Sequence, residues 1–89
     1  MTMIIDHGEV RNVQLRVINK KGQEFKIIDA KYELTREAKQ EILQSGQCEV
    51  KDHVISAIIS IKESGIFWMK FIYQIGSETF VDVVEVVSL

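Results

Sequence analysis

The stretch that decides the fold is residues 66–87, which read IFWMKFIYQI-GS-ETFVDVVEVV. Its two flanking runs are rich in β-branched and aromatic residues, a composition typical of β-strands. Gly76 and Ser77 separate them, and a glycine first in a two-residue loop predicts a type II′ turn. That turn fixes the register of a long hairpin, in which Trp68 lies opposite Glu85.

This register gives the hairpin two faces, because successive side chains of a strand point to opposite sides. We assign the more apolar face to the core, and it carries Phe67, Met69, Phe71, Tyr73, Phe80, Val84 and Val86. Asp82 falls on the same face. A carboxylate there indicates either a position near the edge of the sheet, where water can reach it, or a register that differs by one residue.

The opposite face should look at solvent, yet Trp68, Ile72, Val81 and Val83 form an apolar cluster on it. Tryptophan combines a large apolar area with a hydrogen-bonding N–H, so an exposed cluster of this kind is typical of a contact site. The alternative is that the N-terminal strand or a loop covers the cluster. The predicted interface, for another copy or a partner subunit, comprises Trp68, Lys70, Ile72, Val81, Val83 and Glu85.

The rest of the chain also alternates apolar and polar residues with period two, which indicates half-buried strands. The alternating runs are 13–17, 25–27, 28–34, 47–51 and 55–61. Short turn segments containing Gly, Asn, Asp or Ser separate these runs. The pattern predicts an all-β, antiparallel β-sandwich of about seven to eight strands.

Two places depart from simple alternation. Ile27 and Ile28 are adjacent apolar residues that shift the buried set from odd to even positions, which predicts a bulge or a corner. Residues 35–44 are rich in helix formers, with Thr35 as a candidate N-cap. A short helix over 35–44 and a hairpin loop are both open, and the hairpin is favoured.

Composition sets the class of protein. The chain has 89 residues, 46% hydrophobic and 27% charged, so we expect a single globular domain over 1–89. A net charge of −2 argues against nucleic-acid binding, which needs cations against phosphates. No apolar run reaches the ~20 residues of a membrane helix, and the first residues are too few for a signal peptide. We expect a soluble protein that folds in a reducing compartment, since its one cysteine cannot form an internal disulfide.

Little in the sequence suggests chemistry. His7 and His53 each follow an aspartate in a turn segment, where aspartate is common for backbone reasons. Cys48 lies on an alternating run and is predicted to be a buried structural thiol. There is no Cys/His set for zinc. We therefore predict no catalytic residue, no cofactor and no metal site, and expect that the protein is not an enzyme.

Three segments together resemble the small Ig-like domains of tailed-phage and prophage virion proteins. They are residues 9–17 followed by the turn 19–22, residues 27–34, and residues 63–71. The pattern is similar to the N-terminal domain of the baseplate upper protein family. The resemblance implies an Ig-like fold with a hairpin at 35–44. It also implies a structural role in a virion, as a head, connector or tail/baseplate component.

Under this resemblance the partners are other copies or neighbouring virion proteins. The protein would then reside in the virion, or in the bacterial cytoplasm during assembly. The alternative is a small bacterial ligand-binding or regulatory β-sandwich protein. That function predicts a concave apolar cavity with a few convergent polar groups.

Overall fold

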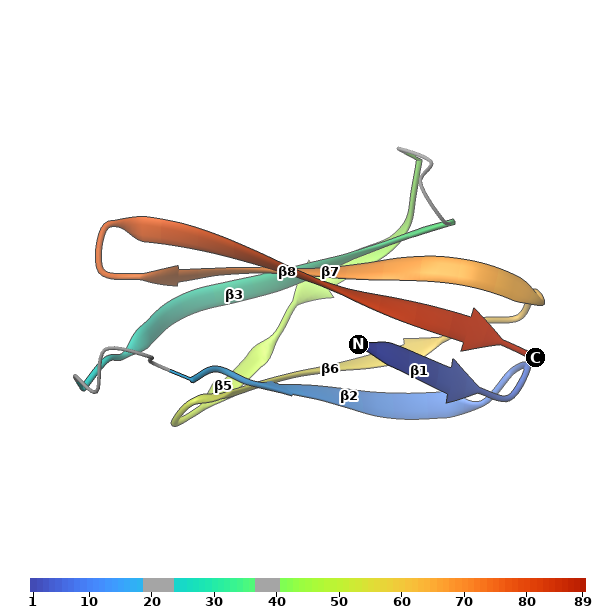
Figure 1. Ribbon diagram of the computed structural model, residues 1–89, viewed down its shortest axis with the longest axis horizontal. Helices are drawn as coiled ribbons and strands as arrows, with labels where there is room; N and C mark the ends of the chain where they lie inside the picture. The colour runs from blue at the N-terminus through green and yellow to red at the C-terminus, as the bar shows by residue number, and fades with distance from the viewer. Residues whose placement is uncertain (19–23, 37–40) are drawn as a thin grey trace.

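The computed structural model describes residues 1–18, 24–36 and 41–89. These residues form eight strands in two sheets and contain no helix (Figure 1). The five-stranded sheet has the order β1-β8-β7-β3-β4, with β1 Thr2–Ile5, β8 Glu78–Ser88, β7 Gly65–Ile75, β3 Ile27–Arg36 and β4 Ile42–Gln47. The three-stranded sheet has the order β2-β6-β5, with β2 Val10–Arg16, β6 Val54–Ser60 and β5 Glu49–Lys51. The predicted all-β class and strand count are confirmed.

The β7–β8 hairpin has the predicted register. Trp68 lies opposite Glu85 along the full antiparallel pairing of the two strands. Gly76 has φ 61°, whereas Ser77 does not adopt a positive φ. This is the combination that a type II′ turn requires, and the glycine supplies it without a steric cost.

The irregularity predicted between Ile27 and Ile28 is a β-bulge. The pairing of β3 with β7 shifts between Ile27 and Asp29, so that Ile28 is the extra residue. Ile27 is 4% exposed and Ala30 is 2% exposed, but Ile28 is 60% exposed. The assignment of Ile28 to the buried set was therefore wrong, because the bulged residue turns outward while its neighbours stay in the core.

The favoured hairpin in the 35–44 region is confirmed, and the alternative helix is wrong. Thr35 and Arg36 end β3, Ile42 begins β4, and the two strands pair antiparallel. Residues 37–40 lie outside the described part of the chain. The helix-forming composition of this segment is overridden by strand pairing, since propensity is weak in a short stretch.

The prediction of a wholly antiparallel fold was wrong at β1. This strand pairs parallel with β8, with Thr2 opposite Glu85. After β1 the chain turns at His7 and Gly8, where Gly8 has φ 78°, and enters β2 in the other sheet. Because β1 is not joined to β8 by a tight turn, nothing forces the two strands to run in opposite directions.

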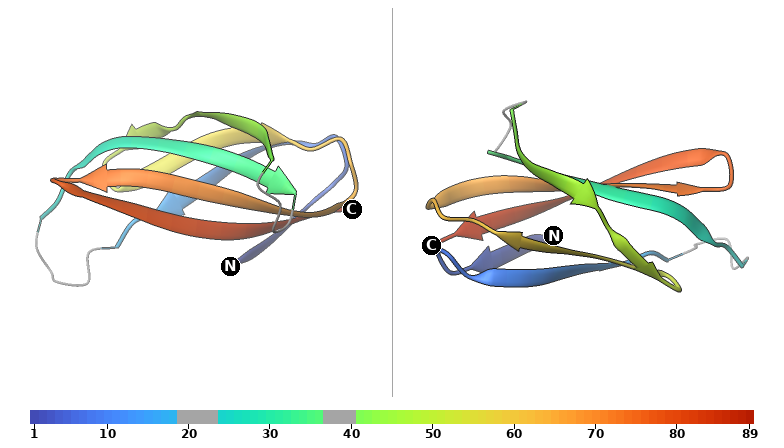
Figure 2. Two further views of the ribbon diagram at one scale, coloured as in Figure 1. Left: turned by 90° about the horizontal axis from the view of Figure 1, so that it is seen from above. Right: turned by 180° about the vertical axis from the view of Figure 1, so that it is seen from behind.

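At the other side of the molecule a single run of chain belongs to both sheets. The Cys48 amide donates to the Ala30 carbonyl oxygen at 2.9 Å, which continues the pairing of β4 with β3. The next residue, Glu49, already pairs with β6. The right-hand view of Figure 2 shows this run passing from one sheet to the other without a loop.

Inward side chains of both sheets form one hydrophobic cluster. Its fully buried large members are Phe67, Phe71, Ile5, Leu34, Ile55, Ile59, Met69 and Val86. The predicted core face of the hairpin is confirmed for every residue except Phe80, which is 38% exposed. Phe80 lies near the turn end of the hairpin, where it lines an open cleft.

Candidate docking face

The side of the five-stranded sheet that points away from the hydrophobic cluster is called the outer face here. Strand pairing places all six predicted interface residues on it. Glu85, Trp68 and Thr35 form one row across β8, β7 and β3. The next row is formed by Val83, Lys70 and Glu33, and the third by Val81, Ile72 and Lys31.

Three of the predicted interface residues are strongly exposed. Val81 is 53% exposed, Val83 is 46% exposed and Trp68 is 37% exposed. Ile72, Lys70 and Glu85 are half-buried. The alternative that the N-terminal strand covers the cluster is wrong, because β1 extends the edge of the sheet beside β8. The predicted apolar cluster therefore faces water.

Two further exposed residues belong to this surface and were missed by sequence reasoning. Ile4 of β1 is 59% exposed and Ile66 of β7 is 40% exposed. They lie on either side of Val87, which pairs with both. Ile66 could have been found from its alternation with Phe67. Ile4 could not, because its place depends on a parallel pairing between the two ends of the sequence.

We name the outward apolar side chains of β1, β7 and β8 that are exposed or half-buried the apolar strip. It comprises Ile4, Ile66, Trp68, Ile72, Val81, Val83 and Val87. The outward side chains of β3 and β4 are different, and we name them the polar half. It comprises Asp29, Lys31, Glu33, Ser45 and Gln47. Ile42 and Leu43, at the start of β4, are exposed apolar residues beyond the polar half.

The charges in the middle of the outer face are balanced. Lys31 and Lys70 carry positive charge, and Glu33 and Glu85 carry negative charge. Lys70 lies between Glu33 on one side and Val83 on the other. Glu85 is held in place by Thr2, whose hydroxyl donates to Glu85 Oε1 at 3.2 Å. The face therefore carries no strong field of either sign.

A second feature is an open cleft of about 1020 Å³ beneath the turn end of the β7–β8 hairpin. Its lining includes Phe25, Ile75, Tyr73, Phe80 and Asp82. The segments that supply these residues are far apart in the sequence, so alternation within one strand gives no sign of the cleft. It is the concave, largely apolar surface that a ligand-binding protein would need.

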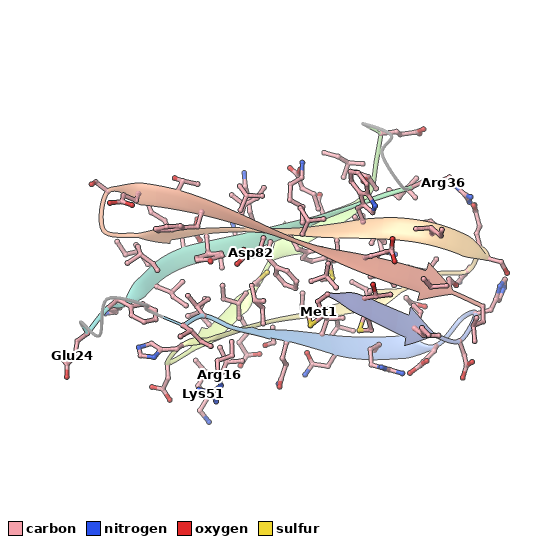
Figure 3. The ribbon with its side chains drawn as sticks, viewed as in Figure 1. Met1, Arg16, Glu24, Arg36, Lys51 and Asp82 are labelled. Atoms are coloured by element: carbon pink, nitrogen blue, oxygen red, sulfur yellow. The ribbon has the colours of Figure 1, made fainter. Side chains whose placement is uncertain are left out.

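Asp82 lies in this cleft, on the inner side of the hairpin (Figure 3). The Tyr73 hydroxyl donates to Asp82 Oδ2 at 2.7 Å, and the rings of Tyr73 and Phe80 stack with centroids 5.6 Å apart. Burial, together with the Asp82 carboxylate, raises the pKa of Tyr73 to about 12. The predicted placement of Asp82 on the core face is confirmed. Its carboxylate is tolerated because it is exposed and bonded.

The histidines occupy turns, as predicted. Asp52 and His53 form a two-residue turn between β5 and β6, and Asp52 has φ 55°, a conformation that aspartate tolerates. The His53 ring stacks on Phe25 at 4.0 Å, and its Nε2 lies 3.1 Å from the Phe25 carbonyl oxygen. His53 therefore packs against the segment that precedes β3. His7 is exposed in the turn after β1.

Cys48 is half-buried rather than fully buried, and it packs against the hydrophobic cluster. Burial, with a smaller contribution from Asp29, raises the pKa of its thiol to about 11. The thiol is therefore protonated near neutral pH and is a poor nucleophile. Within the described ranges, no group of three or more His, Cys, Asp or Glu side chains is placed to hold a metal ion.

The described residues include no helix of the length and apolar character needed to cross a membrane. Comparison of the chain with protein families, with curated proteins and with solved structures gave no match.

Proposed function

We propose that this chain is a non-catalytic docking module that binds another protein through the outer face of its five-stranded sheet. The observation that carries the proposal is the apolar strip. Val81, Val83 and Ile4 each leave about half of their surface in water, beside Trp68. Large contiguous apolar patches are uncommon on soluble proteins and usually mark sites where another molecule binds.

The contrast between the two halves of the face supports the same proposal. The solvent side of an antiparallel sheet is normally polar, and the polar half on β3 and β4 follows that rule. The apolar strip breaks it over most of the length of β7 and β8. The strip also includes a tryptophan, a residue type that is enriched where binding energy is concentrated.

We propose further that the two sheets pack as an Ig-like sandwich. Immunoglobulin domains place strands B, E and D in one sheet and strands C, F and G in the other, with C′ added beside C in some domains. The order β2-β6-β5 corresponds to B-E-D, and the order β8-β7-β3-β4 corresponds to G-F-C-C′. In this comparison β1 is a first strand that joins the sheet of strand G.

The biological setting that we propose is a phage or prophage virion. The resemblance of residues 9–22, 27–34 and 63–71 to virion Ig-like domains is the basis of this proposal. Mass spectrometry of purified particles from a strain that carries the gene tests it. Detection of the chain in stoichiometric amounts is the expected result, and its absence from the particles would refute the virion role.

The docking function is tested by site-specific photo-cross-linking in cells that express the chain together with the neighbouring genes. A photoreactive amino acid replaces Val83 in the apolar strip or, as the matched control, Ile58. Ile58 is 65% exposed on the three-stranded sheet, far from the outer face. We expect protein adducts from position 83 and none from position 58. Equal labelling at both positions, or no adduct at position 83, would refute docking through this face.

A second candidate function, binding of a small apolar ligand, is favoured by the cleft. Phe25, Tyr73 and Phe80 supply aromatic surface there, and Asp82 supplies a carboxylate. NMR screening with small aromatic compounds tests this function. Saturable shifts confined to the cleft residues in the wild type, and lost in Phe80→Ala, would support it. Shifts that persist in that variant would refute it.

A further inference from the structure

We propose that the partner of the outer face is a second copy of this chain, related by a two-fold axis that runs along the strands above the boundary between β7 and β8. This inference rests on the proposed docking function and names its occupant. It follows from where the apolar strip lies on the sheet, from the residues that the arrangement brings together, and from the charges of β7 and β8.

The position of the apolar strip selects the axis. The strip lies on β7, β8 and β1, so its centre is near the boundary of β7 and β8 rather than at the middle of the sheet. A two-fold axis above that boundary places β7 of one copy on β8 of the other. Apolar residues then meet at the centre, and β4 lies outside the contact, as expected for a polar rim.

The rotation covers β7 of one copy with β8 of the other along their full length, because each strand has eleven residues. β3 and β1 overlap only where Thr35 meets Thr2 and Arg36 meets Met3, because β1 has four residues. Two strands ~4.8 Å apart, at ~3.3 Å per residue, span roughly 350 Å². A standard protein interface covers about 800 Å² on each partner, so we expect a weak dimer that forms at high protein concentration.

The same rotation brings two complementary pairs together, and it leaves the flexible side chain of Lys70 beside Val83 of the second copy. Ile72 lies opposite Val81 within the sheet, so the axis places Ile72 of one copy over Val81 of the other. Trp68 is likewise placed over Glu85 of the second copy. The indole N–H can only donate a hydrogen bond and the carboxylate can only accept one. The Thr2 hydroxyl already holds one oxygen of Glu85, which orients the carboxylate.

The charges permit two identical faces to meet. The outward charged residues of β7 and β8 are Lys70 and Glu85, which are opposite in sign, so two copies do not repel each other at the contact. A partner with a strongly charged surface would gain nothing from this face. Two-fold dimers in which the same patch meets itself are also the commonest closed assembly among soluble proteins.

The test uses two single variants that should fail alone and succeed together. Ile72→Asp and Val81→Lys each place a charge against an apolar residue of the second copy, which should weaken the dimer at least about tenfold. In a mixed dimer the two introduced charges face each other at one contact, and the other contact is wild type. We expect sedimentation velocity to show a dimer for the wild type, monomers for each variant, and a dimer for the equimolar mixture.

Ile58→Lys is the matched control, because it places a lysine at an exposed apolar site on the other sheet. It should leave the dimer unchanged. Circular dichroism checks that each variant is folded. If Ile72→Asp is not folded, Val83→Lys replaces it, since Val83 would lie over Lys70 of the second copy. Lys70→Glu is then the complementary partner in the mixture.

A wild type that stays monomeric up to a concentration of about 1 mM, well above the dissociation constants of ordinary specific complexes, would overturn the inference. A dimer that Val81→Lys leaves intact, or a mixture that does not recover, would also overturn it. Photo-cross-linking distinguishes failure of the docking function from failure of the second copy as its partner. A monomer that still forms adducts from position 83 with a different protein keeps the docking function and loses the second copy. A monomer without such adducts loses both.

Discussion

The outer faces of β7 and β3 are adjacent in the same sheet, yet they differ in what they expose to water. On β3 the outward residues include Lys31 and Glu33, whereas on β7 they include Ile66 and Trp68. Both strands bury their opposite sides in the same hydrophobic cluster. The difference teaches that β7 has two apolar faces with separate uses, one for folding and one that we assign to binding.

The largest expected effect separates the two faces of β7. Phe71 is 0% exposed and Ile72 is half-buried on the outer face. We expect Phe71→Ala to lower the free energy of unfolding by about 3–5 kcal/mol, because it leaves a cavity in the core. Ile72→Ala should cost less than half as much. Urea denaturation of the two variants measures both values. Equal losses would mean that the outer face is also needed for folding.

The second prediction concerns the two halves of the outer face. We expect Val81→Lys with Val83→Lys to change the free energy of unfolding by no more than about 1 kcal/mol, since both sites are on the surface. The double variant should also lose the self-association that we expect of the wild type. The matched pair is Lys31→Ala with Glu33→Ala in the polar half, which should leave association unchanged. Light scattering on a sizing column compares the two double variants.

The third prediction concerns the turn end of the β7–β8 hairpin. Near the turn, the Tyr73 hydroxyl bonds to Asp82 in the cleft. We expect Tyr73→Phe to lower the free energy of unfolding by about 0.5–1.5 kcal/mol, the usual net value of one hydrogen bond. Thermal unfolding of this variant at pH 7 measures the change. No measurable loss would mean that water replaces the hydroxyl without cost.

The same pair predicts a dependence on pH. The pKa of Tyr73 is raised to about 12 in the folded protein, above its ordinary value of about 10. Stability from this group is therefore fully present below pH ~10 and is lost as the pH rises towards 12. The wild type should lose more stability than Tyr73→Phe across this window. Urea unfolding at several alkaline pH values compares the two proteins.

The smallest expected effect lies at the edge of the apolar strip. Thr2→Val removes the hydroxyl that donates to Glu85 across the β1–β8 pair. Because the bond is exposed, we expect a loss of unfolding free energy below about 0.5 kcal/mol. The dissociation constant of the dimer should rise by a larger factor than the equilibrium constant for unfolding, since the Glu85 side chain is then free to move. A change in stability without a change in affinity would show that Thr2 serves the fold alone.

The sequence was sufficient for features that depend on local rules. Alternation and the Gly76-Ser77 turn together determined the hairpin register, and with it the positions of Trp68 and Asp82. The adjacent pair Ile27 and Ile28 marked the bulge. Each of these features involves residues that are close in sequence, so the pattern of side chains carries the information.

Features that depend on distant segments could not be read in the same way. Nothing in residues 2–5 indicates that they pair with β8, so Ile4 was missed from the outer face. The exposure of Phe80 depends on how far the opposite sheet extends beneath the hairpin. The cleft likewise forms between β8 and the segments beside β2 and β3. Sequence reasoning supplies the strands and their faces, and tertiary packing decides which faces are covered.

The parallel pairing of β1 with β8 has a mechanical consequence. The Glu85 amide donates to the Met1 carbonyl oxygen and the Leu89 amide donates to the Ile5 carbonyl oxygen, each at 3.0 Å. Suppose that tension pulls Met1 and Leu89 apart along the strand direction. Because the two strands run in parallel, such a pull slides one past the other and loads the hydrogen bonds between them together. Antiparallel strands joined in a hairpin would open one bond at a time. This clasp between the first and last strands would make the domain resist stretching.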